Sequence, residues 1–174
     1  CLKCTWCAEG NHHLCPNVRV LGTPPVLGAL QQRFSWPAGL CVPISDEIRD
    51  EQAVLLTPLS MAIHIADQAH LGLMGTVAVI GCGNLGLLLI ETLRAGGAGE
   101  IVAVDLVPYR RDAALRHGAT RALDPHAATE LVREFPRRGV DVAIDVSNAS
   151  EGSRAAQQLV RTGGRVVVAG IPED

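Results

Sequence analysis

Residues 76–86 read TVAVIGCGNLG, a short apolar run followed by three glycines spaced Gly-x-Gly-x-x-Gly. The run predicts a strand that is buried on both faces, and the leucine-rich stretch at 84–96 predicts a helix. Gly81 would allow a tight turn, Gly83 would let the backbone approach a pyrophosphate, and Gly86 would let the helix lie close to the strand. The turn is therefore predicted to bind a dinucleotide. A glycine-rich turn that serves packing alone is the alternative.

The acid that closes the next apolar run belongs to the same prediction. EIVAVD, residues 100–105, ends at Asp105, about 20 residues beyond the last glycine, where a carboxylate hydrogen-bonds the adenosine ribose and repels a 2′-phosphate. The pattern favours NAD over NADP, and Arg110 is then expected to flank the adenine or stack on it. Two alternatives stay open: an arginine at 110 or 111 is also able to accept a 2′-phosphate, and Asp105 could instead cap the helix that begins near Pro108.

Strand-like and helical patterns alternate from Thr57 onward. Five strands are predicted, with the fragment at 120–124 as an edge strand: 76–80, 100–105, 120–124, 140–145 and 165–170. Five helices are predicted, the fourth ended by Pro136: 57–70, 84–96, 108–118, 128–135 and 151–163. In the first helix, Met61, Ile65 and Ala69 share one face. Unbroken Val, Ile and Ala runs are typical of a parallel sheet covered on both faces, so the predicted fold class is α/β with a doubly wound parallel sheet.

The composition narrows the class of protein. Of the 174 residues, 48% are apolar and 19% charged, with a formal net charge of -3, which indicates a globular chain and argues against nucleic acid or an anionic membrane as partner. No apolar run approaches the roughly 20 residues that span a bilayer, and no signal peptide is visible, so a cytoplasmic location is expected. Because the chain lacks an initiating Met and stops just after a strand-like run, we expect it to be an internal piece of a longer protein.

Four of the six cysteines lie in the opening stretch CLKCTWCAEGNHHLC. Their spacing, C-x2-C-x2-C-x7-C, lets four thiolates converge on one centre and satisfies a tetrahedral Zn²⁺ with no open position. We therefore predict a structural zinc site that stabilises a loop-rich region with little core of its own. Disulfide pairing and an iron–sulfur cluster are the alternatives, whereas a thioredoxin-type motif would need a strand before it and a helix after it. The predicted ligands are Cys1, Cys4, Cys7 and Cys15.

Other histidines and cysteines near these motifs are assigned no chemistry. His12 and His13 are expected to be exposed loop residues, because four thiolates are already available. Cys41 is isolated, and Cys82 occupies a position in the glycine turn where any small residue fits.

Four stretches together carry a resemblance to a known family: the cysteine-rich start, VLGTPPVLGAL at 20–30, DEQAVLLTPLSMAIHIA at 50–66 and VAVIGCGNLG at 77–86. Over essentially its whole length the chain resembles the zinc-dependent medium-chain dehydrogenases, most of all their sorbitol (L-iditol) 2-dehydrogenase and polyol dehydrogenase branch. The resemblance implies that residues 1–56 are a remnant of a GroES-like catalytic domain with its irregular zinc-binding lobe. It implies that residues 57–174 are a Rossmann-type dinucleotide-binding domain, incomplete at its end.

The resemblance also implies an activity, the oxidation of a secondary alcohol or polyol to a ketone by hydride transfer to NAD. The cofactor-binding residues that it implies are Gly81, Gly83, Asn84, Leu85 and Gly86 at the pyrophosphate, Asp105 and Arg110 at the adenosine, and Ala169, Gly170 and Ile171 towards the nicotinamide. A small alcohol or polyol is the implied substrate, and a homo-oligomer is the implied assembly.

Two departures from the family pattern concern the catalytic zinc, which polarises the alcohol oxygen in these enzymes. Its ligands, a Cys and a His-Glu pair, lie upstream of the cysteine-rich stretch in the family, so no catalytic residue is assigned within this chain. Thr57 stands where relatives have a glutamate near the metal, and a hydroxyl is a poorer zinc ligand than a carboxylate. Thr57 either bounds the pocket only, or this member binds catalytic zinc weakly or not at all. His64 on the same helix is expected to be a packing residue rather than a ligand.

Three functions therefore stay open. The favoured one is a fragment of a zinc- and NAD-dependent polyol or secondary-alcohol dehydrogenase. A threonine-type or general alcohol dehydrogenase would share the same frame and differ in substrate. A non-catalytic module that binds zinc and a dinucleotide is the alternative from another class, because no catalytic metal-ligand set can be assembled from this chain.

Overall fold

The chain folds into two compact units. The computed structural model describes residues 1–135 and 137–171, and its contacts separate Cys1–Ser45 from Asp46–Asp174. The sequence-based division between residues 56 and 57 concerns the domains of a longer protein and stays a prediction. Within the described residues, no helix has the length and apolar character needed to cross a membrane.

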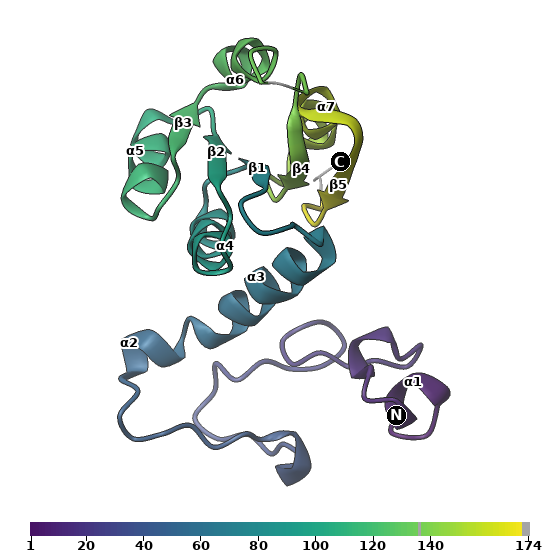
Figure 1. Cartoon of the computed structure of the whole chain (residues 1–174). Helices are drawn as coiled ribbons and strands as arrows, with labels where there is room; N and C mark the ends of the chain where they lie inside the picture. Colours follow the sequence, from purple (N-terminus) through teal and green to yellow (C-terminus); the bar gives the residue numbers. More distant parts are fainter. Residues whose placement is uncertain (136, 172–174) are drawn as a thin grey trace. The chain divides into compact units, whose positions relative to one another are not determined.

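A five-stranded parallel sheet forms the centre of the second unit (Figure 1). Its strands are β1 (Thr76–Ile80), β2 (Glu100–Val104), β3 (Arg121–Leu123), β4 (Val140–Asp145) and β5 (Val160–Val168). The strand order is β3-β2-β1-β4-β5, which places the short fragment near 120–124 at an edge, as predicted. Val79 pairs with Ala103 on one side and with Ile144 on the other, so β1, β2 and β4 end side by side.

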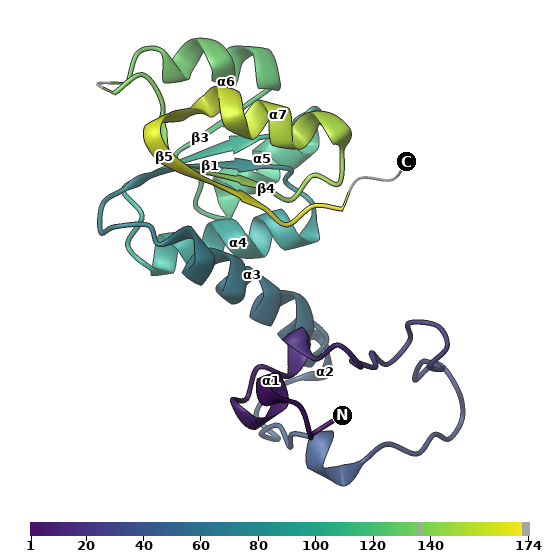
Figure 2. The ribbon, with the colours of Figure 1, turned by 90° about the vertical axis from the view of Figure 1, so that its right-hand side faces the viewer.

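Helices cover both faces of this sheet, which explains why its central strands are apolar throughout. α3 (Leu56–Ala69) and α4 (Asn84–Ala95) pack on one face, and α6 (Pro125–Val132) and α7 (Ser150–Leu159) pack on the other (Figure 2). α5 (Pro108–Arg116) contributes Ala114 to the same core as α3 and α4. A short helix, α2 (Asp50–Ala53), precedes α3. Leu89 and Leu93 belong to the core of the first face, and Leu159 to that of the second. The predicted α/β class with a doubly wound parallel sheet is confirmed.

The end of α7 differs from the prediction. The sequence predicts a helix over 151–163, but α7 ends at Leu159, and Val160 already pairs with Val140 of β4. The pairing then shifts, so that Val142 lies opposite Arg165. Gly163 has a φ of +73°, a conformation that glycine adopts without strain and that suits an irregular strand. The prediction was wrong here because pairing with β4 overrides the local helical pattern.

α6 begins earlier than the predicted 128–135, because a capping acid starts it. Asp124 Oδ1 accepts hydrogen bonds from the backbone N–H groups of His126 and Ala127, each at 3.0 Å, and Pro125 takes the first helical position.

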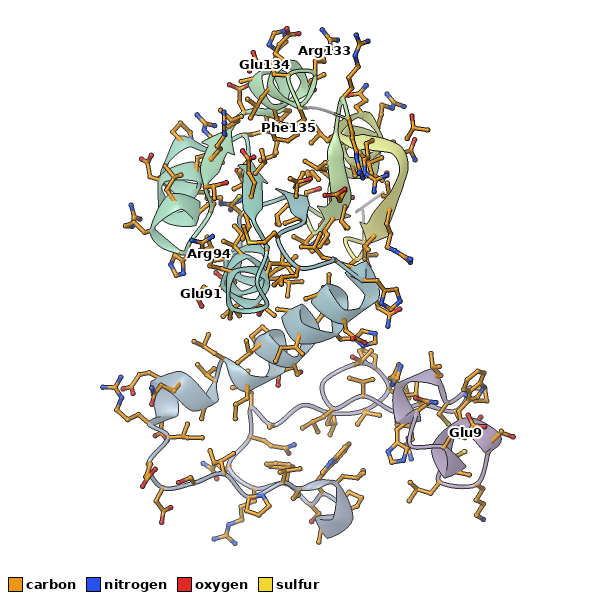
Figure 3. The ribbon with its side chains drawn as sticks, in the orientation of Figure 1. Glu9, Glu91, Arg94, Arg133, Glu134 and Phe135 are labelled. Atoms are coloured by element: carbon orange, nitrogen blue, oxygen red, sulfur yellow. The ribbon has the colours of Figure 1, made fainter. Side chains whose placement is uncertain are left out.

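The chain leaves α6 after Val132 instead of continuing to residue 135. Arg133 and Glu134 are exposed, whereas Phe135 turns towards the sheet and packs against the core of the second face (Figure 3). The predicted helix stop, Pro136, lies outside the described residues.

One position in α3 also departs from the predicted face. Ile65 and Ala69 are buried as expected, but Met61 is 51% exposed and Ala62 is buried instead. The buried residues therefore follow the spacing i, i+3, i+7 from Ala62, whereas the prediction used i, i+4, i+8 from Met61. A helical period allows both spacings.

Asp141 ties together the amino ends of β1, β4 and β5. Its Oδ2 accepts hydrogen bonds from the backbone N–H and the hydroxyl of Thr76, both at 2.9 Å, and its Oδ1 accepts one from Arg161 Nε at 2.7 Å. The Thr76 N–H, followed by the Arg161 guanidinium, lowers the pKa of Asp141 to about 2. The carboxylate is thus ionised at neutral pH and fixes this end of the sheet.

The first unit has little regular structure. It contains α1 (Thr5–Ala8) and two 3-10 turns, η1 (His12–Leu14) and η2 (Ala38–Leu40). Across residues 1–45, all of which the structure describes, Cys7 and Cys15 are the two buried residues. Most large apolar side chains in this unit are exposed, including Leu27 at 77% and Val42 at 85%. Burial of apolar surface therefore contributes little to the stability of this unit.

Candidate functional site

A cleft of about 750 Å³ opens at the carboxyl ends of β1, β2 and β4. The chain leaves β1 towards β2 and later returns to the other side of β1 as β4, so the cleft lies where the strand order reverses. This is the position where open α/β sheets bind ligands. Seven of the predicted cofactor-binding residues line it: Gly81, Gly83, Asn84, Leu85, Gly86, Asp105 and Arg110.

Two glycines of the turn between β1 and α4 are required by geometry. Gly81 has a φ of +97°, and a Cβ added to it would lie 2.7 Å from Ser147 Cα. A Cβ on Gly86 would overlap the carbonyl oxygen of Gly81. At Gly83, in contrast, an added Cβ would meet no atom within 4 Å, so the space over its backbone is open. The turn is tightly packed on the protein side and accessible at Gly83.

The amino end of α4 faces this open space. Gly83 is its N-cap, and no side chain caps the helix. The N–H groups of the first turn therefore lack partners within the helix, and the helix dipole adds a positive partial charge there. Since Asn84, Leu85 and Gly86 line the cleft, this arrangement fits a phosphate group.

Asp105 joins the glycine turn to the turn after β2. Its side chain is 6% exposed; Oδ2 accepts a hydrogen bond from Cys82 N–H and Oδ1 accepts one from Val107 N–H, both at 2.8 Å. Val107 is the N-cap of α5, and no side chain caps that helix, so Asp105 does not serve as its cap. A carboxylate has about four acceptor positions, which leaves lone pairs for ribose hydroxyls.

The two neighbouring arginines play different parts. Arg111 Nη1 donates to the carbonyl oxygens of Asp105 and Leu106, each at 2.9 Å, and so closes the turn after β2. Arg110 Nη1 lies 3.8 Å from Asp105 Oδ2, its side chain is 44% exposed, and its guanidinium is 6.0 Å from the ring centre of Tyr109. Arg110 is therefore the one with donors available to a ligand in the cleft.

The predicted residues at the end of β5 lie beside the cleft rather than in its lining. The backbone N–H groups of Ala169 and Gly170 donate to the carbonyl oxygen of Asp145, at 2.9 and 3.0 Å. The N–H of Ile171 donates to Asn148 Oδ1 at 3.0 Å. Asn148 does line the cleft, so the segment 169–171 is held against one of its walls.

That wall, the loop after β4, was missed by the sequence analysis. Four residues of the loop line the cleft, and three from α7 join them: Val146, Ser147, Asn148 and Ala149, then Glu151, Gly152 and Ala155. The buried Asp145 orders the loop, because its Oδ1 accepts hydrogen bonds from Ser147 N–H at 2.9 Å and from Ser147 Oγ at 2.7 Å. The signal was the mostly polar run SNAS at 147–150, one residue after a buried strand, but its use required knowing that β4 lies next to β1.

Cys82 has no exposed thiol. It is 1% exposed, and burial, followed by the charge of Asp105, raises the pKa of its thiol to about 12. A protonated, inaccessible thiol is a poor nucleophile and a poor metal ligand. The geometry agrees with assigning no chemistry to Cys82.

The four cysteines of the first unit form a second candidate site. Cys7 lies in α1 and Cys4 at its N-cap; Gly10, at a φ of +83°, then reverses the chain and brings Cys15 back towards them. The Sγ atoms of Cys1, Cys4, Cys7 and Cys15 all lie within 4.8 Å of one another. The structure thus brings together all four predicted ligands.

These distances fit one tetrahedral metal ion. Four sulfurs at about 2.3 Å from Zn²⁺ are about 3.8 Å from each other, close to the arrangement of the four Sγ atoms. Cys1 Sγ and Cys15 Sγ are 3.4 Å apart, well beyond the roughly 2.05 Å of a disulfide bond. Among the described residues, this is the one group of three or more His, Cys, Asp or Glu side chains placed to hold a metal ion.

The remaining residues considered from the sequence lie outside both sites. His12 and His13 are exposed in η1, as expected, and Cys41 is exposed. Thr57 is exposed in the first turn of α3. His64 is exposed on the same helix, so packing within the second unit does not bury it.

A larger cavity of about 950 Å³ lies at the opposite end of the sheet. It borders the amino ends of the strands, where Asp141 already pairs with Arg161. It contains neither the glycine turn nor a helix N-terminus, so the smaller cleft is the better candidate for dinucleotide binding.

Comparison with known proteins agrees with this geometry. Residues 84–174 match the family described as zinc-binding dehydrogenase, and the chain belongs to that family. Sorbitol dehydrogenase of Bacillus subtilis (strain 168) is 36% identical over 175 residues, which covers 99% of this chain and 50% of that protein. D-xylulose reductase A of Aspergillus oryzae is 32% identical over 178 residues, covering 98% of this chain and 50% of that protein. The chain thus spans about half the length of these curated relatives.

A solved structure extends the likeness to three dimensions. A Sinorhizobium meliloti protein, described as a zinc-binding dehydrogenase and bound to NADP, superposes with a TM-score of 0.88 at 27% identity. The match covers 99% of this chain and 52% of that one. The resemblance to zinc-dependent dehydrogenases expected from the sequence is confirmed.

Proposed function

We propose that this chain is the dinucleotide-binding part and structural zinc lobe of an NAD-dependent zinc alcohol or polyol dehydrogenase. One observation carries the proposal: the glycine turn, the free amino end of α4 and Asp105 meet in one cleft at the reversal of strand order. These are the three parts that hold a pyrophosphate and an adenosine ribose.

Different residues of the cleft would bind different parts of the dinucleotide. The N–H groups at the start of α4 would bind the pyrophosphate, with Gly83 leaving room for it. Asp105 would accept hydrogen bonds from the ribose hydroxyls, and Arg110 would flank the adenine. The segment 169–171 would approach the nicotinamide side. When bound, NAD supplies the hydride acceptor for oxidation of a secondary alcohol to a ketone.

NAD is the proposed cofactor because a buried carboxylate stands at the ribose position. A 2′-phosphate would meet the charge of Asp105, only partly offset by Arg110 at 3.8 Å. The Sinorhizobium relative binds NADP, so the preference needs a direct measurement. In titration calorimetry NADH should bind the chain with a lower dissociation constant than NADPH, and equal or reversed affinities would overturn the preference.

In the cysteine cluster, Zn²⁺ would act as a structural cross-link with no position open to substrate. The fit rests on four Sγ atoms within 4.8 Å of one another, two of them in buried residues. Metal analysis of the purified chain should give roughly one zinc ion per chain. Iron with the visible absorption of a cluster would instead support the iron–sulfur alternative.

The described residues contain one candidate metal-ligand group, the four cysteines, so we place the catalytic zinc ligands outside this chain. The same observation favours the second candidate function for the isolated chain, a module that binds zinc and a dinucleotide without turnover. Turnover by the 174-residue chain alone would refute this second candidate. If the coding sequence upstream lacks a Cys and a His-Glu pair, the zinc-catalysed reaction is refuted for the full-length protein.

The likeness to sorbitol dehydrogenase and D-xylulose reductase supports a polyol as substrate. NAD reduction by the full-length protein should be faster with sorbitol or xylitol than with threonine or simple alcohols. Preference for threonine would support the threonine-type alternative. A cytoplasmic homo-oligomer completes the proposal, and light scattering on the full-length protein tests the assembly.

A further inference from the structure

Asn148 has an unusual backbone conformation at the wall of the cleft. Its φ is +57°, in the left-handed region where asparagine is enriched among residues with a side chain. Its Oδ1 accepts a hydrogen bond from the N–H of Ile171 at 3.0 Å. The side chain thus links the loop after β4 to the chain that leaves β5.

The backbones of these two segments also touch. A Cβ added to Gly170 would lie 2.9 Å from Asn148 N, so the approach of the two backbones leaves no room for a side chain at residue 170. On its other side, the loop is joined to β1, because Val146 N–H donates to the carbonyl oxygen of Ile80 at 2.9 Å. Ile80 directly precedes the glycine turn. A continuous set of contacts therefore runs from the glycine turn through Asn148 to Ile171.

From this geometry we propose that Asn148 is a positioning residue for the nicotinamide half of the dinucleotide, an inference that rests on the proposed function. By holding Ile171, it sets the distance between the segment 169–171 and the glycine turn. The adenosine half depends on Asp105, directly after β2, and on Arg110 of α5, and neither shares a hydrogen bond with Asn148. Loss of the Asn148 side chain should therefore weaken binding of the nicotinamide half and leave binding of the adenosine half unchanged.

Binding of NADH and of ADP-ribose to the 174-residue chain, measured by titration calorimetry, separates the two halves. The informative number is the dissociation constant of ADP-ribose divided by that of NADH. It measures the contribution of the nicotinamide half, which ADP-ribose lacks. Asn148→Gly removes the acceptor but tolerates the positive φ, and should lower the preference for NADH about three- to tenfold, the worth of one hydrogen bond. Asn148→Asp keeps an acceptor oxygen and should restore the ratio to within about twofold.

His70 offers a matched control. It also has a left-handed φ, +46°, but it ends α3 at the other end of the sheet. His70→Gly should relieve the same kind of backbone strain and leave the ratio unchanged.

Two results in the variants would overturn the inference: a wild-type ratio in Asn148→Gly, which includes an equal loss of NADH and ADP-ribose binding, or failure of Asn148→Asp to restore the ratio. An unmutated chain that binds ADP-ribose but shows no preference for NADH would overturn it as well. An unmutated chain that binds neither ligand would refute the proposed function itself, before any variant is made.

Discussion

The two compact units of this chain reach order by different physical means. Asp46–Asp174 buries apolar side chains on both faces of a parallel sheet, with residues such as Leu89 and Ile144 fully enclosed. Cys1–Ser45 buries two residues, both of them cysteines, and leaves most of its large apolar side chains exposed. One unit therefore has its own hydrophobic core, whereas we propose that the other depends on a metal ion.

Because of this difference, the two candidate sites are held rigid by different interactions. The cleft is shaped by strand ends and close backbone contacts, so its geometry follows from the folding of the second unit. The cysteine cluster has no such scaffold, and binding of a metal ion would supply folding free energy directly. Four experiments test the contrast, beginning with the largest expected effect.

Loss of the metal should unfold the first unit and spare the second. Cys7→Ser, or chelation, should release zinc and abolish hydrogen-exchange protection across residues 1–45, since structural zinc contributes on the order of 10 kcal/mol. Protection in β1 and β4 should stay unchanged. Mass spectrometry of exchange measures both units in one sample.

Cys41→Ser is the matched control, because Cys41 is an exposed thiol of the same unit outside the cluster. It should retain zinc and protection. If Cys7→Ser leaves the protection of residues 1–45 intact, the proposed dependence on metal is wrong.

Alanine substitutions at two glycines of the turn should have different effects, one on the stability of the second unit and the other on NADH binding. Gly86→Ala places a Cβ against the carbonyl oxygen of Gly81 and should lower the free energy of unfolding by about 1–3 kcal/mol. Gly83→Ala meets no atom within 4 Å and should cost less than about 1 kcal/mol, while NADH affinity falls on the order of tenfold. Urea unfolding and NADH titration give the two quantities. Unchanged NADH affinity in Gly83→Ala would contradict the assignment of the pyrophosphate to this position.

Asp141→Asn should destabilise the second unit and alter its response to acid. The pKa of Asp141 is lowered from 3.8 to about 2 on folding, so its contribution is present above about pH 4 and is lost as the pH falls towards 2. Because the side chain is 31% exposed, we expect only about 1–2 kcal/mol at pH 7 after allowance for solvent screening.

Urea unfolding at pH 7 and pH 3 measures this effect. The stability difference between the wild type and Asp141→Asn should narrow at the lower pH. Asp112→Asn, which removes an exposed charge from α5, should cause little change at either pH. Equal effects of the two substitutions would show that Asp141 does not fix the ends of the strands.

The smallest effect concerns a cysteine inside the core of the second unit. With the pKa of its thiol raised to about 12, Cys82 should stay unmodified by iodoacetamide at pH 8, while the exposed Cys41 is alkylated. Peptide mass spectrometry reads both positions. Alkylation of Cys82 at the rate of Cys41 in the folded chain would show that the glycine turn opens.

Local patterns were sufficient for most of the fold. Apolar strands, helical periods and the glycine turn act between residues that are close in sequence, and they predicted the α/β class and most element positions. Predictions were wrong where a distant or capping partner decided, as with Val160, which pairs with Val140, and with Asp124, which starts α6 early.

The same distinction applies to the candidate sites. The sequence by itself determined the cysteine spacing, the glycine turn and the acid at the end of β2, because each depends on a short stretch of chain. The tertiary structure alone decided that β4 lies beside β1, that Asp105 bonds to Cys82, and that Asn148 holds Ile171 at the wall of the cleft. Strand order and register arise from pairing between distant segments, and no local pattern encodes them.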